Sequence, residues 1–187
     1  SHIDPHIPSV TYDQTHGTRI VTEHLLELGH RHICEISGTI ATRIDAEVRH
    51  RAFVETMQKY GMTNPMSVAG DFDIQGGYDA VGKLLDDNVE FTALVCVNDE
   101  TALGAIQRLR HAGLRIPEDV SVVGYDDRSF SRFLYTPLTT VRQDFDLLGS
   151  TAIRYLGELL EDKSTPLEQR LLVPELIIRE STSQLPY

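Results

Sequence analysis

The sequence predicts an α/β protein in which a parallel sheet is flanked by helices on both faces. Short apolar runs, typical of buried strands, alternate with stretches of helical period about 10–15 residues long. Such alternation indicates β-α units that cover both faces of a parallel sheet. The chain has 187 residues, 41 % of them hydrophobic, so a sizeable core is available for one domain or for two lobes that share strands.

The first two predicted strands frame a helix that has a stop signal. Residues 7–12 form a strand that ends at Asp13, and residues 18–28 follow with helical spacing. Gly29 is a plausible stop for that helix, because glycine adopts the left-handed conformation common just after a helix. Residues 32–36 then form the second strand.

A second helix begins near Asp45, which is an N-cap candidate. It carries Phe53, Met57 and Tyr60 on one face and ends at Gly61. The same rhythm continues through the middle of the chain. The next predicted elements are strand 67–69, helix 75–85, strand 92–97, helix 100–112 and strand 120–125.

The rhythm changes after Pro137. A strand at 138–141 leads to a helix at 146–161. The residues expected on its buried face are Leu148, Ala152, Leu156 and Leu159. Short strands at 171–173 and 176–178 then flank Pro174, which restricts that point to a crossing or a sheet edge.

Charge and composition exclude several functions. The net charge of −11 argues against direct nucleic-acid binding by this chain, because phosphate binding needs a basic surface. Cys34 and Cys96 lie inside apolar runs, as buried cysteines of a reduced cytoplasmic protein do. There is no apolar run long enough to span a membrane, and no zinc, dinucleotide, P-loop or nucleophile-elbow motif.

Six segments in fixed order carry a family resemblance. They are HGTRIVTEHLLELGHRHI, EVRHRAF, ALVCVNDETALGAIQ, GLRIPEDVSVVGYDD, TPLTTVRQDFDLLG and LIIREST. Together they resemble the effector-binding core of the LacI/GalR family of bacterial transcriptional regulators. The resemblance extends from about residue 7 to residue 182.

The resemblance implies a periplasmic-binding-protein-like core with two lobes joined by three strand crossings. Residues 14–142 and 173–181 would form the C-terminal lobe, and residues 1–13 and 143–172 would belong to the N-terminal lobe. Residues 182–187 are expected to be a polar tail. Because no DNA-binding headpiece, no hinge and little of the first lobe precede this core, we expect the chain to be a fragment.

Three polar residues are expected at the carboxyl edge of the sheet, where ligands bind in open α/β folds. Asp126 follows the strand 120–125, and Asn98 stands where a strand gives way to a helix. Arg49 lies on the sheet-facing stripe of its helix and therefore needs a partner. The structural alternatives are an ion pair for Arg49, a helix N-cap for Asn98 or Asp99, and a helix or loop cap for Asp126. A further alternative is a metal or acid/base pair formed by Asp126 and Asp127.

The resemblance implies ligand contacts for Asp126 and Asn98, and it adds further positions. Phe72 and Phe145 are aromatics after presumed strand ends, suited either to the core or to the apolar face of a sugar ring. The weaker implied contacts are Asp13, Asp45, Gln143 and Leu148.

We therefore expect a binding module rather than an enzyme, with no cofactor and no metal. Its expected ligand is a sugar or glycoside, and its expected partner is a second copy bound through the C-terminal lobe. The loop 128–135 suits that interface because it holds Phe130, Phe133, Leu134 and Tyr135. Operator DNA is expected as a partner of the full-length protein only. The alternative is an exported sugar-binding protein of a transporter.

Overall fold

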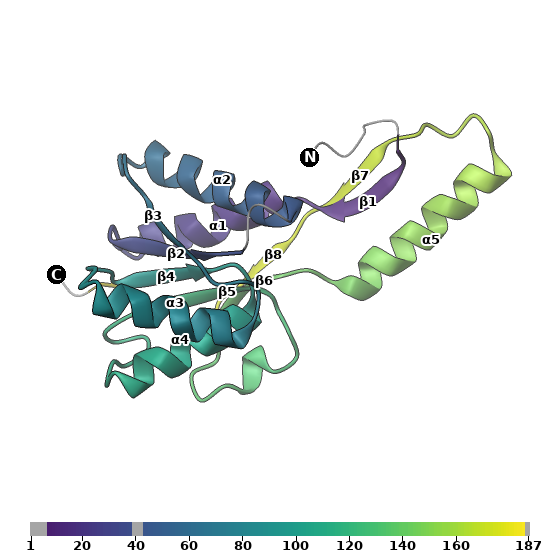
Figure 1. Cartoon of the computed structure of the whole chain (residues 1–187). Coiled ribbons are helices and arrows are strands. Elements are labelled where there is room, and N and C mark those ends of the chain that lie inside the picture. The colour runs from purple at the N-terminus through teal and green to yellow at the C-terminus, as the bar shows by residue number, and fades with distance from the viewer. Residues whose placement is uncertain (1–6, 39–42, 186–187) are drawn as a thin grey trace.

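The computed structural model describes residues 7–38 and 43–185 and contains a six-stranded sheet between two helical layers (Figure 1). In sheet order the strands are β3 (Met66–Ala69), β2 (Ile33–Ser37), β4 (Ala93–Cys96), β5 (Ser121–Asp126), β6 (Thr139–Arg142) and β8 (Glu175–Ile177). The first five are parallel, and β8 is an antiparallel edge strand. The predicted fold class is confirmed.

Two pairs of helices cover the sheet. Helices α1 (Gln14–Glu27) and α2 (Ile44–Lys59) pack together on one face, and α3 (Ile74–Asp86) and α4 (Asp99–His111) pack together on the other. Strand β4 shows how one run serves both layers, because successive side chains point to opposite faces. Leu94 belongs to the core under α3 and α4, and Val95 to the core under α1 and α2.

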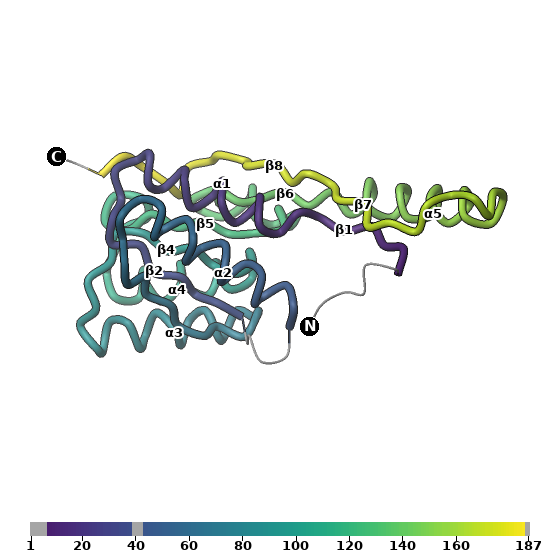
Figure 2. The backbone as a smooth tube through the Cα atoms, turned by 90° about the horizontal axis from the view of Figure 1, so that it is seen from above, coloured from purple at the N-terminus to yellow at the C-terminus, as the bar shows by residue number. Residues whose placement is uncertain are grey.

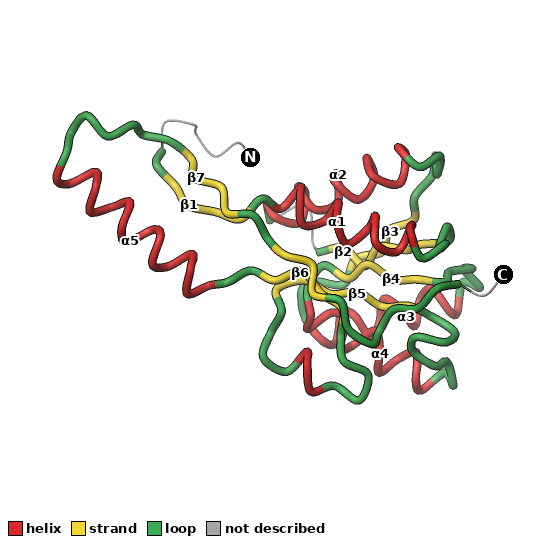
Figure 3. Tube along the Cα trace, turned by 180° about the vertical axis from the view of Figure 1, so that it is seen from behind, coloured by secondary structure: helices red, strands yellow, loops and turns green. Residues whose placement is uncertain are grey.

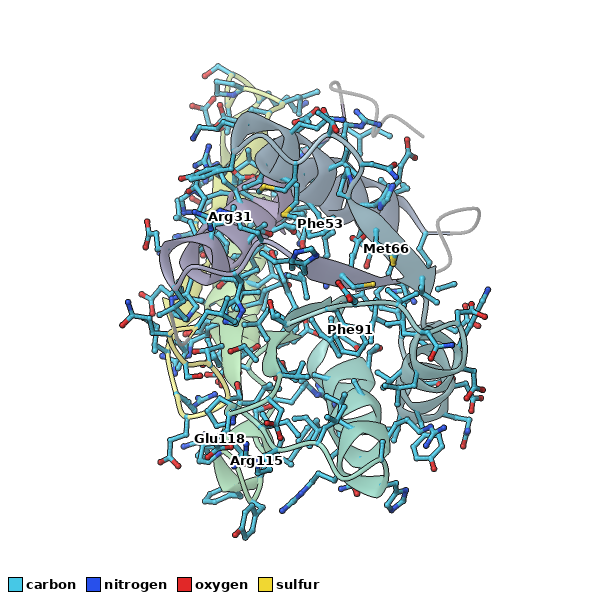
Figure 4. All side chains as sticks on the ribbon, turned by 90° about the vertical axis from the view of Figure 1, so that its left-hand side faces the viewer. Arg31, Phe53, Met66, Phe91, Arg115 and Glu118 are labelled. Atoms are coloured by element: carbon cyan, nitrogen blue, oxygen red, sulfur yellow. The ribbon has the colours of Figure 1, made fainter. Side chains whose placement is uncertain are left out.

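The two cores can be followed from the end of the molecule remote from α5 (Phe145–Glu161) (Figure 4). Phe53 is fully buried among the residues of the α1–α2 core, whereas Phe91 packs against the α3–α4 core. Glycine allows α3 and α4 to approach closely. A Cβ atom on Gly77 would lie 2.0 Å from the carbonyl oxygen of Thr101, so only glycine fits there.

A second, smaller unit extends from the carboxyl edge of the main sheet (Figures 1 and 2). Strand β1 (Ser9–Tyr12) pairs in parallel with β7 (Gln169–Leu172), and α5 packs against β1. The Tyr155 hydroxyl donates to the carbonyl oxygen of Pro166, which holds α5 to the segment that leads into β7. The view from behind shows the chain passing between the two units next to β6 and β8 (Figure 3).

Several local predictions were wrong. Helix α1 begins at Gln14 rather than at residue 18, because Asp13 caps it by accepting from the backbone N–H of His16. Asp45 is not an N-cap, since Arg43 holds that position without a side-chain bond. On α5, Thr151 and Tyr155 are the buried residues, whereas Ala152 and Leu156 are exposed.

Parts of the predicted organisation lie outside the described residues. These are residues 1–6 of the first segment, the loop residues 39–42 and the last two residues of the tail.

Candidate functional site

Arg49 lies at the carboxyl edge of the sheet, where β4 and β5 end side by side. It is 6 % exposed, and its guanidinium stacks on the ring of Tyr125 with 3.7 Å between the guanidinium carbon and the ring centroid. It donates to the carbonyl oxygen of Val97 and, at 2.9 Å, to Oε1 of Gln14. Its Nη2 lies 3.7 Å from Oδ1 of Asp126. Helix α2 therefore places a buried cation against the ends of two strands.

Asp126 is a mostly buried carboxylate with few partners. Among the described residues no hydrogen-bond donor contacts it, and its ion pair with Arg49 is longer than a hydrogen bond. Burial raises the pKa of the Asp126 carboxyl to about 6, and the positive charge of Arg49 opposes that shift. Its backbone φ is 105°, in a region that non-glycine residues adopt rarely and mostly at functional sites. The carboxylate is thus left with acceptor capacity for a ligand.

Asn98 is the N-cap of α4. Its Oδ1 accepts from the backbone N–H of Thr101 at 2.8 Å, and its Nδ2 donates to the carbonyl oxygen of Phe72 at 3.0 Å. One amide hydrogen remains for a ligand. The capping alternative therefore holds for Asn98 and is wrong for Asp99, which lies inside α4.

The Phe72 ring lies at the same edge of the sheet. The Arg43 guanidinium stacks over it, with 4.4 Å between the guanidinium carbon and the ring centroid. The phenylalanine has a positive φ of 65°, and its carbonyl is held by Asn98. The structure thus brings Arg49, Asn98, Asp126 and Phe72 to one edge of the sheet, as the topology predicted.

Asp127 serves a different set of contacts from Asp126. Its two oxygens accept from Arg142 at 2.7 Å and from Arg179 at 2.6 Å. The adjacent carboxylates therefore do not share a partner. Among the described residues, no group of three histidine, cysteine, aspartate or glutamate side chains is placed to hold a metal ion.

A cavity of about 530 Å³ opens between the two units, lined by β1, β7 and the starts of α1 and α2. Asp13 and Asp45, both predicted ligand contacts, line it. Gln143 is buried and donates to Oε1 of Gln14, another lining residue, at 3.2 Å. Gln14 thus connects the cavity with Arg49 and with the crossing after β6.

Phe145 and Leu148, the last two predicted ligand contacts, are not linked to the other site residues by the contacts described above. Phe145 is 51 % exposed at the start of α5, and Leu148 is half-buried one turn further on. Within residues 7–38 and 43–185, no polar or ring contact joins either of them to Arg49, Asn98 or Asp126.

Three residues of this network were missed by sequence reasoning. They are Gln14, Tyr125 and Asp99. Gln14 and Tyr125 each stand beside an aspartate at a strand end, which is a signal that could have found them. Asp99 gives no such signal: it is fully buried and accepts from the backbone N–H of Arg128 and from the hydroxyls of Ser131 and Thr140.

Comparison with known proteins places this arrangement in a family. Residues 22–182 match the family described as periplasmic binding protein-like domain. A protein of Haemophilus influenzae named HTH-type transcriptional repressor PurR is 41 % identical over 174 residues, which cover 90 % of this chain and 52 % of that protein. The chain belongs to the LacI/GalR family of transcriptional regulators. It spans about half the length of the curated relatives it matches.

Solved structures of proteins from the same family are similar to this chain. A dimeric Lac repressor with a C-terminal deletion superposes with a TM-score of 0.92 at 32 % identity, covering 99 % of this chain and 67 % of that one. A LacI family regulator from Enterococcus faecium with bound ribose gives a TM-score of 0.90 at 28 % identity, covering 100 % and 69 %. These relatives are named as repressors and regulators, in agreement with the prediction of a binding module rather than an enzyme. Among the described residues no helix is both long and apolar enough to cross a membrane.

Proposed function

We propose that this chain is the effector-binding and dimerisation core of a cytoplasmic transcriptional regulator that binds a sugar or a small glycoside. The acidic chain would not contact DNA itself, because its net charge of −11 opposes binding to phosphate. Operator binding would belong to the full-length protein. Relatives named as transcriptional repressors favour this function over that of an exported sugar-binding protein.

The observation that carries the ligand proposal is the Asp126 carboxylate, buried at the carboxyl edge and left without a donor among the described residues. A sugar hydroxyl can donate to that carboxylate and accept from Arg49 at the same time. An anionic ligand is disfavoured because Asp126 would repel it. Phe72 would supply an aromatic face at the same edge. The bound ribose in the Enterococcus faecium regulator supports the same ligand class.

The extended unit is proposed to be part of an N-terminal lobe. We assign residues 7–13 and 143–172 to that lobe, and residues 14–142 and 173–181 to the C-terminal lobe. Support comes from the separate β1–β7 sheet and from Pro174, which stands where the chain passes from β7 to β8. The outer face of α5 also exposes Ile153, Leu156 and Leu160. An apolar row of this length suits coverage by the remainder of a lobe.

Effector binding at the carboxyl edge, next to the cavity, would then change how the two lobes sit relative to each other. A ligand that contacts both lobes binds one lobe arrangement better than another and shifts the population toward it. The DNA affinity of the full-length protein would follow that shift. Gln14 follows β1 and Gln143 follows β6, so each stands at a crossing. The side chain of Gln143 donates a hydrogen bond to that of Gln14.

A thermal-shift and calorimetric screen of the full-length protein tests this function. The panel is D-ribose, D-galactose and cellobiose, with the nucleobases adenine and hypoxanthine as a ligand class that is not a sugar. A compound that binds only the folded state raises its melting temperature. We expect a sugar to stabilise the wild type and Asp126→Asn to lose about a hundredfold in affinity, as expected for one charged hydrogen bond. Asp86→Asn, an exposed aspartate on α3, is the matched control and should bind normally. Stabilisation by a nucleobase alone would refute the sugar class.

A further inference from the structure

The side chain of Gln14 is held in one orientation by two donors that reach it from different parts of the chain. Nε of Arg49, on α2, lies 2.9 Å from Oε1 of Gln14. Nε2 of Gln143, just after β6, lies 3.2 Å from the same oxygen. The guanidinium nitrogen carries a hydrogen and can only donate, so the amide atom that faces it has to be the oxygen. The orientation of the Gln14 amide is therefore fixed by chemistry.

Fixing the oxygen also fixes the amide nitrogen. The Nε2 group of Gln14 carries two hydrogens, and among the described residues no acceptor receives either of them. Gln14 is half-buried and lines the 530 Å³ cavity beside Asp13. A half-buried amide whose oxygen is saturated and whose nitrogen has no acceptor offers its donor hydrogens to whatever occupies the cavity.

The cavity lining also holds two carboxylates and one cation. Asp13 and Asp45 line the same cavity and, as carboxylates, only accept. Arg43, the lining cation, is engaged with Asp45 and with the ring of Phe72. The Gln14 amide is one of several neutral donors in the lining, together with the hydroxyls of Thr11 and Thr15 and the amide of Gln169. It can donate to one oxygen of a ligand without attracting anions.

We propose that Gln14 is a specificity-determining residue of the effector site, whose side-chain N–H group donates a hydrogen bond to one hydroxyl or ring oxygen of the bound sugar. This inference rests on the proposed sugar-binding function and adds a contact to it. A site built to hydrogen-bond a particular hydroxyl rejects the analogue that lacks it, because the protein donor is then left unpaired.

Two substitutions separate the donor from the rest of the side chain. Gln14→Glu keeps an oxygen for Arg49 and Gln143 and replaces the free donor with an acceptor of the same shape. Gln14→Met keeps the length and removes both polar groups. Gln58→Glu makes the same charge change on an exposed face of α2 and is the matched control.

The measurement is calorimetric affinity of the full-length protein for D-ribose, D-galactose and cellobiose, followed by the monodeoxy analogues of the tightest binder. We expect Gln14→Glu and Gln14→Met each to weaken that sugar about tenfold, and Gln58→Glu to leave its affinity unchanged. In the wild type one monodeoxy analogue should bind about tenfold more weakly than its parent because of this contact. In Gln14→Met the difference for that analogue should disappear, whereas the other analogues keep theirs.

The failures can be told apart. If Asp126→Asn abolishes sugar binding but both Gln14 variants bind within about twofold of wild type, the Gln14 inference is overturned and the proposed function stands. If Gln14→Met weakens the parent sugar and every analogue in parallel, Gln14 only positions Arg49 and the contact is refuted. If none of the three sugars binds the wild-type protein, the sugar class and the Gln14 assignment both fall.

Discussion

Asp126 and Asp127 are neighbours at the end of β5, yet their surroundings shift their pKa values in opposite directions. Burial raises the pKa of Asp126 to about 6, because Arg49 offsets only part of the desolvation. Burial also acts to raise the pKa of Asp127, but hydrogen bonds from Arg179 and Arg142 outweigh it and hold that pKa below the usual range. Among the described residues the Asp126 carboxylate accepts no hydrogen bond, whereas the Asp127 carboxylate accepts from two arginines.

Asp126 is expected to reduce stability at neutral pH. Between about pH 4 and 6 the native carboxyl holds its proton when the unfolded one has lost it, so stability falls as pH rises through that window. We therefore expect Asp126→Asn to raise the free energy of unfolding by about 1–3 kcal/mol at pH 7.5 and to change it little at pH 4.5. Urea unfolding at both pH values measures this. A less stable variant at pH 7.5 would contradict it.

At the scale of single elements, the β-α order was predictable because each strand is a short apolar run closed by a polar residue or glycine. The faces of helices were less predictable. On α5 the leucine row was assigned to the buried face, but the buried residues are Thr151 and Tyr155. The Tyr155 hydroxyl donates to the carbonyl oxygens of Pro166 and Glu168. Hydrophobicity ranks side chains by transfer energy and does not show which neighbour a helix has.

The candidate site divides in the same way. Arg49, Asn98 and Asp126 could be brought together from sequence because parallel strands end at one edge of the sheet. Gln14 could not be placed in the site from sequence, because its orientation depends on hydrogen bonds from Arg49 and Gln143. These residues lie 35 and 129 positions further along the chain. Spacing along a chain carries no information about such contacts until the topology is known.

The side chain of Glu35 on β2 connects that strand with β3 and α2. Glu35 is 4 % exposed, and its Oε2 accepts from Ser67 on β3 at 2.7 Å and contacts Nδ1 of His50 on α2 at 2.6 Å. The hydrogen bond to Glu35 raises the pKa of His50 above its usual value. Ser67 and His50 contact the same oxygen of Glu35, and protonation of His50 makes its contact an ion pair.

The contribution of His50 to stability should depend on pH. A histidine whose native pKa is raised stabilises the fold fully below pH 6.5 and loses that contribution as pH rises through the native pKa. We expect His50→Gln, which keeps a neutral donor, to lower the unfolding free energy by about 1 kcal/mol at pH 5.5 and by less at pH 8.5. Equal losses at the two pH values would refute the charged pair.

For the whole molecule, the loop after β5 is the candidate self-association surface. Phe133 and Tyr135 are 80 % and 85 % exposed, whereas Phe130 and Leu134 are partly buried, and Leu134 packs on the α3–α4 core. Two exposed aromatics at one site suit the centre of an interface. Of the four residues predicted for the interface, Phe133 and Tyr135 are the two that are exposed.

Replacing Phe133 tests that surface. We expect Phe133→Asp to raise the dimer dissociation constant of the full-length protein by at least about thirtyfold, because an interface aromatic is replaced by a charge that would be buried. Sedimentation of the variant over a range of concentrations measures this. Phe145→Asp, at the start of α5, is the control for a general effect of charge on an exposed phenylalanine. A dimer of wild-type affinity after Phe133→Asp would place the interface elsewhere.

The crossings between the two units are linked by Asp127. Its carboxylate, 8 % exposed, joins Arg142, at the end of β6, to Arg179, just beyond β8. Arg142 also lies 3.8 Å from Glu175 at the start of β8. One side chain thus holds two segments that lead to or from the extended unit.

Removing that charge should weaken both the fold and the coupling between lobes. We expect Asp127→Asn to lower the unfolding free energy at pH 7.5 by about 2–3 kcal/mol, because two charge-assisted hydrogen bonds lose their anion. Since the native pKa of Asp127 is lowered, its contribution is present above the unfolded pKa of 3.8 and is lost as pH falls through the native value. The difference in unfolding free energy between the variant and the wild type should therefore shrink at acidic pH.

The same variant tests whether the crossings carry the effector signal. If they do, Asp127→Asn keeps sugar affinity within about threefold, while the change in operator affinity on sugar binding becomes smaller. Unaltered stability would show that the two arginines find other partners, and an unaltered operator response would place the coupling elsewhere.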